Sequence, residues 1–325
     1  MFERRLISDI KPLENWNVSK CEDLNNIFSN CRNLSDISPL KNWDVSNCKN
    51  LSYLFGGCNI SDINPLKYLN ISNVKDFSGL FYGMKNLTDI SLIQNWDFSN
   101  SKTLHALFAS CENLSDISPL KIWNISKCED ISSLFNGCKK ISDISLLKNW
   151  NVSNVKDLGY LFSGCENLSD ISPIKNWNIS KCENISYLFH ECKKLSDISP
   201  LKNWNVSNIK DFSSLFYECS SITDIKSLEN WNVSNGTTFN MMFSHCNFSD
   251  LRPLEDWNVS KVKKFSFMFC DCSSIKDLKP LENWNVSKGE DFYGMFGRCK
   301  LIKNKNIIKN WNFSKNVDIG SMFYE

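Results

Sequence analysis

The fold is decided by one stretch of 27 residues, Trp150-Asn-Val-Ser-Asn-Val-Lys-Asp-Leu-Gly-Tyr-Leu-Phe-Ser-Gly-Cys-Glu-Asn-Leu-Ser-Asp-Ile-Ser-Pro-Ile-Lys-Asn176. From Val152 to Ile174 its apolar residues recur mostly at every third position. This spacing fits neither a long helix nor an alternating strand. It is typical of a coil that turns about its own axis and points one side chain inward at each short step. One coil cannot bury that inner row alone, whereas a stack of coils buries it continuously.

The same stretch recurs along the whole chain. All 11 tryptophans share one register, Leu69 fills the one vacant Trp slot, and a serine and a phenylalanine follow every slot by three and twelve residues. The sequence therefore predicts a single repeat solenoid over residues 1–325. Its twelve coils start near residues 16, 43, 69, 96, 123, 150, 177, 204, 231, 257, 284 and 311.

Three segments are expected within each coil. Trp150–Val155 alternates β-branched and polar residues and is the best strand candidate. Asp157 is placed to cap a short helical turn over Leu158–Cys165, because its carboxylate can accept free backbone amides. Leu168–Ile174 is expected to be an extended or turn-rich return, since its proline excludes a central strand.

These columns resemble the BspA-like surface-protein repeats of mycoplasma and listeria lipoproteins, a branch of the leucine-rich-repeat proteins. The resemblance rests on the run from Trp150 to Cys165, and Leu34-Ser-Asp-Ile-Ser-Pro-Leu40 is similar to the Asp-Ile-x-Pro-Leu segment of internalin-type repeats. It implies a leucine-rich-repeat-like solenoid of short parallel strands and short helical turns. It also implies protein–protein interaction, because family members are usually described as surface or adhesion proteins or as proteins of unknown role.

The composition limits the partners and the location that we expect. The chain carries 37 Lys and Arg residues against 36 Asp and Glu residues, so it lacks the basic face that a nucleic-acid partner requires. No apolar run is long enough to predict a membrane span. No signal peptide is visible at the start, and 15 cysteines with no clear pairing pattern favour a reducing compartment. We therefore expect an intracellular, cytoplasmic location rather than a surface one.

Two columns could carry chemistry, and each has a structural alternative. Cysteine stands fifteen residues after most Trp slots, which could indicate metal binding or cross-linking, but we interpret it as a ladder of small buried thiols. Aspartate stands twenty residues after most slots and could bind calcium, but we interpret it as a cap for backbone amides. The repeated Asn-x-Ser sequons are interpreted as turn chemistry rather than as glycan acceptors.

Catalysis has little support in the sequence. The three histidines, His105, His190 and His245, lie at unrelated positions on different coils, and no phosphate loop, nucleophile elbow or zinc-protease motif is present. We expect no enzyme activity, no catalytic residue, no cofactor and no metal.

Function is expected in the positions that vary from coil to coil. Ten and thirteen residues after the Trp slot, aromatic side chains recur on what should be one face of the helical turn. We call this set the aromatic strip, and its members are Tyr53, Tyr82, Tyr160, Tyr187, His190, Tyr217 and Phe267. The alternative is that these side chains are partly buried between neighbouring turns. A second candidate surface is the expected strand face, with Asn or Lys at the fourth position after Trp and Glu or Lys at the sixth.

The leading hypothesis is a scaffold that binds a protein partner along an exposed solenoid face. The alternative is a structural or self-assembling rod, or a surface adhesin. It rests on chain ends without a polar capping unit, at Arg5-Leu6 and Met322–Glu325, which favours end-to-end association.

Overall fold

The computed structural model describes residues 2, 6–314 and 317–324, in two compact units. The N-terminal unit spans residues 1–155 and the C-terminal unit residues 156–325. Each unit is a stack of coils of one kind, so the predicted solenoid is confirmed within each. The single domain over 1–325 stays a prediction. Arg5 and Glu325, part of the proposed association ends, lie outside the described residues.

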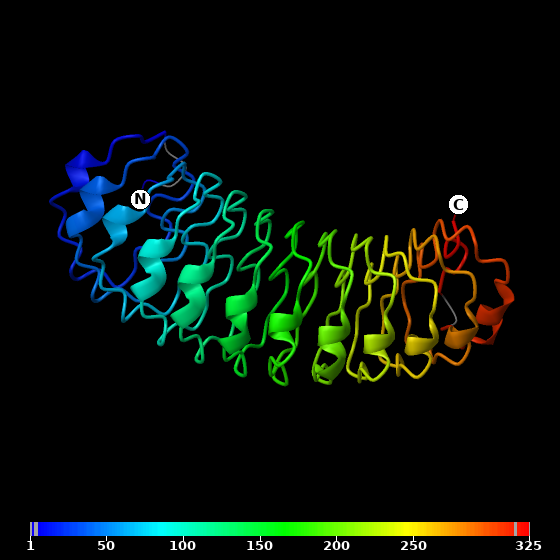
Figure 1. The fold of residues 1–325 in the computed structure, drawn as a ribbon. Helices are drawn as coiled ribbons and strands as arrows, with labels where there is room; N and C mark the ends of the chain where they lie inside the picture. The colour runs from blue at the N-terminus through cyan, green and yellow to red at the C-terminus, as the bar shows by residue number, and fades with distance from the viewer. Residues whose placement is uncertain (1, 3–5, 315–316, 325) are drawn as a thin grey trace. The chain divides into compact units, whose positions relative to one another are not determined.

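We number the positions of a coil from its Trp slot, which is position 0. The twelve helices of the described residues are all short 3₁₀ helices between positions +21 and +26, and they form one row in each unit (Figure 1). In the N-terminal unit they are η1 (Lys11–Leu13), η2 (Ser38–Asn42), η3 (Asn64–Leu66), η4 (Ser91–Asn95), η5 (Ser118–Ile122) and η6 (Ser145–Asn149). In the C-terminal unit they are η7 (Ser172–Ile174), η8 (Ser199–Asn203), η9 (Lys226–Leu228), η10 (Arg252–Leu254), η11 (Lys279–Leu281) and η12 (Asn306–Asn310).

Short parallel pairings and short helical turns are both present, as predicted. The prediction of which segments form them was wrong. The helical turn falls in the proline-containing return, where proline at the start of a helix is favourable because its fixed φ suits the first turn. The parallel pairing falls at position +7, as in the bridge of Asp157 with Asn184, and not over Trp150–Val155. The segment Leu158–Cys165 is a succession of turns rather than a helix.

Those turns are built from a backbone that changes hand twice in each coil. Tyr187 at position +10 has φ +58° and Glu191 at position +14 has φ +57°. Positive φ occurs at the same two positions in all the coils from the one that starts at Trp16 to the one that starts at Trp284. At position +10 the residues are Asn26, Tyr53, Gly79, Ala106, Ser133, Tyr160, Tyr187, Ser214, Met241, Phe267 and Gly294. At position +14 they are Asn30, Gly57, Gly83, Ser110, Gly137, Gly164, Glu191, Glu218, His245, Asp271 and Arg298.

The alternation directs successive amides to different partners. The N–H groups of Tyr187, Phe189 and Glu191 donate to carbonyls of the next coil at 2.8–3.1 Å. The intervening N–H groups of Leu188 and His190 instead close turns within their own coil, three residues back. Every amide of the segment therefore has a partner, as buried backbone requires. The ladder that joins coils depends on the left-handed residues that make this alternation.

The side chains of the core stack in the same register. Phe162, Phe189 and Phe216 at position +12 form a continuous stack with ring centroids 5.9–6.1 Å apart. Trp204 is buried, and its Nε1 donates to the carbonyl of Ile174, 30 residues earlier in the chain, at 3.1 Å. The same bond satisfies the buried indole N–H at most slots of the column, although Trp96 Nε1 has no partner among the described residues.

The cysteine column is a buried ladder of thiols, as predicted. The Sγ atoms of Cys192 and Cys219 donate to the Phe162 and Phe189 carbonyls of the preceding coils at 3.2 and 2.9 Å. Burial raises the pKa of Cys192 well above its ordinary value. A thiol is small enough for this site and supplies a donor, whereas Met84 in the same column has no S–H group to donate.

The aspartate column caps backbone amides, as predicted. Asp36 Oδ1 accepts the N–H of Ser38 at 2.8 Å, just before η2, and the other aspartates of the column accept in the same way. Hydrogen bonding to the Ser38 backbone and side chain lowers the pKa of Asp36. The sequon asparagines make equivalent turns, since Asn124 Oδ1 accepts from both the N–H and the hydroxyl of Ser126.

The burial of the thiols predicts their reactivity. Of the 15 cysteines only Cys21 is half-exposed, and burial raises the pKa of Cys58 and Cys111 to about 12. Ellman's reagent should therefore modify about one thiol rapidly in the native protein and all of them after unfolding, because the thiolate is the reactive form. Rapid reaction of several thiols in the native state would contradict the buried ladder.

The left-handed positions predict a stabilising substitution. Ser214 is buried at φ +53° and its hydroxyl has no hydrogen-bond partner, so Ser214→Gly should stabilise the protein by about 1 kcal/mol. The neighbouring Ser213→Gly is the matched control. Ser213 is not among the positive-φ residues, and its hydroxyl contacts Thr238 at 3.1 Å, so this change should destabilise by about 1 kcal/mol. Urea unfolding midpoints measure both, and equal shifts of one sign would contradict the account.

Candidate interaction surface

The structure brings most of the aromatic strip together, separately in each unit. In the N-terminal unit Tyr53 and Tyr82 meet edge to face at 6.0 Å. In the C-terminal unit a longer run begins with Tyr160 and Tyr187, which stack at 4.3 Å with planes 5° apart. The expected helical turn is absent, yet positions +10 and +13 still converge, because the backbone ladder places them side by side in successive coils.

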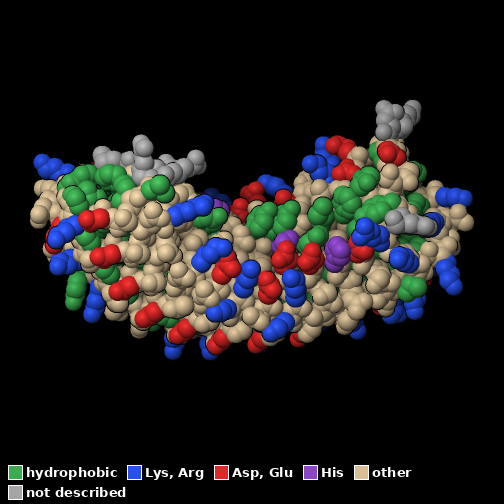
Figure 2. Space-filling view, turned by 90° about the horizontal axis from the view of Figure 1, so that it is seen from above, with side chains coloured by type: hydrophobic (Ala, Val, Ile, Leu, Met, Phe, Trp, Pro, Cys, Tyr) green, Lys and Arg blue, Asp and Glu red, His purple; other side chains and the backbone are tan. Residues whose placement is uncertain are grey.

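The run in the C-terminal unit continues through four coils, and we call it the aromatic row. His190 lies 5.4 Å from Tyr187 and stacks on Tyr217 at 4.9 Å, and Tyr217 meets His245 edge to face at 5.5 Å. The row consists of Tyr160, Tyr187, His190, Tyr217 and His245. Hydrophobic side chains (green) run along this face of the C-terminal unit beside charged and histidine side chains (Figure 2).

The row is neither buried nor fully exposed. Tyr160 keeps 37% of its surface accessible, while Tyr187, His190 and Tyr217 are half-buried by one another. The predicted alternative of partial burial between turns therefore describes the middle of the row. Because rings stacked on one another hide their faces, their edges and hydroxyl groups are what a partner could contact.

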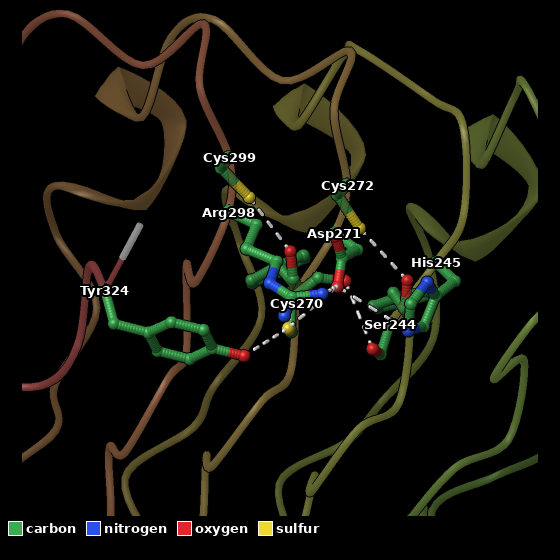
Figure 3. A network of polar contacts seen from close by, with 10 residues as sticks. Ser244, His245, Cys270, Asp271, Cys272, Arg298, Cys299 and Tyr324 are labelled. Atoms are coloured by element: carbon green, nitrogen blue, oxygen red, sulfur yellow. Dashed lines mark hydrogen bonds and ion pairs between the residues drawn. The ribbon is translucent and has the colours of Figure 1, made fainter.

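Sequence reasoning missed His245, at the end of the aromatic row, and Tyr293, a neighbour of Phe267. His245 and Tyr293 lie at positions +14 and +9, outside the two columns chosen, yet Tyr293 meets Phe267 at 5.1 Å. Tyr324 hydrogen-bonds through its hydroxyl to the Cys270 thiol at 3.1 Å (Figure 3). The signal that could have found His245 was the loss of glycine and serine at position +14 in these coils.

Charged groups border the same surface. Asp271 Oδ2 lies 3.6 Å from both His245 Nε2 and Arg298 Nη1, so its charge is balanced (Figure 3). His190 Nε2 lies 3.8 Å from Glu191 Oε1. Burial lowers the pKa of His190, and the Glu191 and Glu218 carboxylates oppose that shift. Burial together with Tyr187 raises the pKa of Tyr160 to about 12.

The second candidate surface, at positions +4 and +6, neutralises much of its own charge. Lys49 pairs with Glu22 at 2.7 Å and Lys263 with Glu290 at 2.8 Å, each across neighbouring coils. The pairs Lys102–Glu129 and Lys210–Glu183 repeat the arrangement. Exposed ion pairs contribute little stability, and here they leave fewer open charges for a partner. This surface is therefore the weaker candidate.

Neither a metal site nor a membrane helix emerges from the part of the chain that the structure describes. Within residues 2, 6–314 and 317–324, no three His, Cys, Asp or Glu side chains converge in a way that could hold a metal ion. The same residues contain no helix with the length and apolar character needed to cross a membrane.

Comparison with known proteins identifies the repeat. The family model described as "Mycoplasma protein of unknown function, DUF285" matches six overlapping stretches, at residues 1–118, 51–171, 107–224, 133–250, 196–303 and 222–325. A search of curated proteins found no match.

Solved structures of similar fold are leucine-rich-repeat proteins. An internalin (inlF) from Listeria monocytogenes is 19% identical, with 90% of this chain and 79% of that chain covered and a TM-score of 0.43. A leucine rich cell surface protein from Faecalibacterium prausnitzii is 14% identical, with 88% and 70% covered and a TM-score of 0.36. The functional domain of InlJ from Listeria monocytogenes, described as including a cysteine ladder, is 12% identical, with 85% and 66% covered and a TM-score of 0.28.

The prediction of an intracellular location is contradicted by these comparisons. The finding against it is that the similar proteins include internalins and one described as a cell surface protein. The argument from free thiols failed for a physical reason. The thiols are shielded by burial, so their number does not report the redox compartment.

The lowered pKa of His190 predicts a pH effect on stability. Below its ordinary value of 6.5 the unfolded chain binds a proton that the folded protein resists, so stability falls as the pH drops through that value toward the folded pKa. His190→Phe should therefore lose less stability than the wild type between about pH 7.5 and about pH 5.5. Urea unfolding midpoints at both pH values measure the difference, and identical losses would show that His190 does not titrate differently on folding.

Proposed function

Because the chain belongs to the DUF285 family over its whole length, we propose its function from the one surface that the repeat does not explain. We propose a non-enzymatic scaffold whose coils act as one repeat domain and bind a protein partner along the aromatic strip. The part of the strip with the strongest support is the aromatic row of the C-terminal unit.

A single observation carries the proposal. Tyr160 and Tyr187 are held at φ +59° and +58°, where a bulky side chain is strained, and yet they form an accessible stack. Glycine occupies the same position at Gly79 and Gly294, so the fold itself does not require a tyrosine there. Strain that the fold does not need is typical of a functional site.

The chemistry of the row suits a protein partner. Tyrosines supply a large contact area at a low entropic cost and are enriched at binding hot spots. The similarity in fold to an internalin and a cell surface protein adds only that such solenoids occur among surface proteins. The rival of a self-assembling rod rested on chain ends that include Arg5 and Glu325, and light scattering over a range of concentrations would detect it.

Photo-crosslinking tests the proposal. A p-benzoylphenylalanine in place of Tyr187 should capture a protein from the source cells, whereas the same group in place of Tyr68, exposed but outside the strip, should not. Excess unlabelled wild-type protein should compete for the capture, and Tyr160→Ala/Tyr187→Ala protein should compete about tenfold less well. Ala106 occupies the same left-handed position, so alanine is compatible with the fold there. Equal capture from both sites, or equal competition by the two proteins, would refute the role of the row.

A further inference from the structure

The left-handed position +14 changes its chemistry along the chain. In the five coils that begin at residues 43, 69, 96, 123 and 150 it carries glycine or serine, the residues that tolerate the site with little strain or bulk. In the next five coils it carries Glu191, Glu218, His245, Asp271 and Arg298. Each of these costs about 1 kcal/mol of backbone strain relative to glycine. The charged run borders the aromatic row and is confined to the C-terminal unit.

Two of these charges have no lysine or arginine partner among the described residues. Glu191 and Glu218 lie on adjacent coils, where their backbones donate to Tyr217 and Ser244 at 2.8 and 3.0 Å. Among the described residues neither carboxylate has a lysine or arginine within 4.0 Å. The imidazole of His190 lies near Glu191, and the Tyr217 hydroxyl hydrogen-bonds to Glu218. At the second candidate surface, by contrast, Glu183 and Glu290 are each paired with a lysine. Glu191 and Glu218 therefore place negative charge without a lysine or arginine partner directly beside the row.

The neighbouring rings define what kind of cation fits. His190 and Tyr217 stack with planes 11° apart, so they offer ring edges and a flat apolar flank rather than open faces. Parallel-paired coils lie roughly 4.8 Å apart. The backbone positions that carry the two carboxylates are therefore separated by about that distance. A guanidinium is planar, carries five donors and can engage two carboxylates while its plane rests against rings. A compact ammonium matches one carboxylate at a time. Phosphate-bearing partners such as nucleic acid or a lipid surface would be repelled.

We propose that Tyr187, His190, Glu191, Tyr217 and Glu218 form a binding site for arginine side chains of an extended segment of a protein partner. The inference rests on the proposed function and names the chemistry of its partner. Glu191 and Glu218 bind the guanidinium groups, and the aromatic row packs against the aliphatic part of the arginine side chain and the flanking backbone.

Fluorescence anisotropy on the full chain tests the proposal with defined probes. The probes are labelled peptides of about 12 residues that alternate threonine with arginine, lysine or glutamate. The arginine peptide should bind more tightly than the lysine peptide, and the glutamate peptide should not bind. Glu191→Gln/Glu218→Gln should weaken binding of the arginine peptide by about tenfold. Glu183→Gln/Glu290→Gln removes the same charge from the other surface of this unit and should change the Kd less than about twofold.

A third variant separates binding from folding. Glu191→Gly/Glu218→Gly should abolish binding and at the same time raise the urea midpoint, because glycine relieves the left-handed strain. Equal weakening in both glutamine variants would show attraction by net charge alone and would overturn the proposal, as would failure of the arginine peptide to bind. If these results fail while Tyr160→Ala/Tyr187→Ala still loses its crosslinked partner, the arginine site is refuted and the scaffold function stands.

Discussion

The structure depends on a backbone that alternates between right- and left-handed residues in each coil. A helix would turn all of its amides toward its own carbonyls, and a strand would turn every second one outward along its length. Here the N–H groups of Tyr187 and Phe189 join the next coil, and the N–H group of Leu188 closes a turn in its own. The coils are thereby fixed in register, and that register aligns the Phe, Cys and Trp columns.

The same constraint separates scaffold from surface. The buried columns are largely satisfied within the stack. The thiols donate to carbonyls of the preceding coil, most indoles donate to carbonyls about 30 residues earlier, and the aspartates cap their own turns. The left-handed positions are different, because most of their side chains are at least partly exposed and glycine would serve the backbone at least as well. Tyr160, Tyr187 and Glu191 at these positions cost stability, and binding is the function that we propose for them. Chemistry that the fold does not need is therefore concentrated on one surface of the C-terminal unit.

Much of the architecture was predictable because a repeat averages out local ambiguity. The Trp and Phe columns identified the coils, and the Cys and Asp columns were assigned correctly to burial and capping. The internal structure of a coil was not predictable, because left-handed φ at Tyr53 or Glu218 has no sequence signal when glycine is absent. A helical turn was expected there for this reason, and the 3₁₀ helix was missed in the return. The columns of the strip were found, but the neighbours His245 and Tyr293 and the open charge of Glu191 depend on how coils stack.

The handedness of the backbone can be measured directly through the tyrosines. Cross-correlated relaxation in protein labelled at tyrosine distinguishes positive from negative φ, and the chain contains both kinds. Tyr53, Tyr160 and Tyr187 at position +10 should show positive φ, whereas Tyr68, Tyr82, Tyr217 and Tyr293 should show negative φ. Negative φ at all of these tyrosines would contradict the alternating ladder, and with it the account of how the coils join and where the strain is stored.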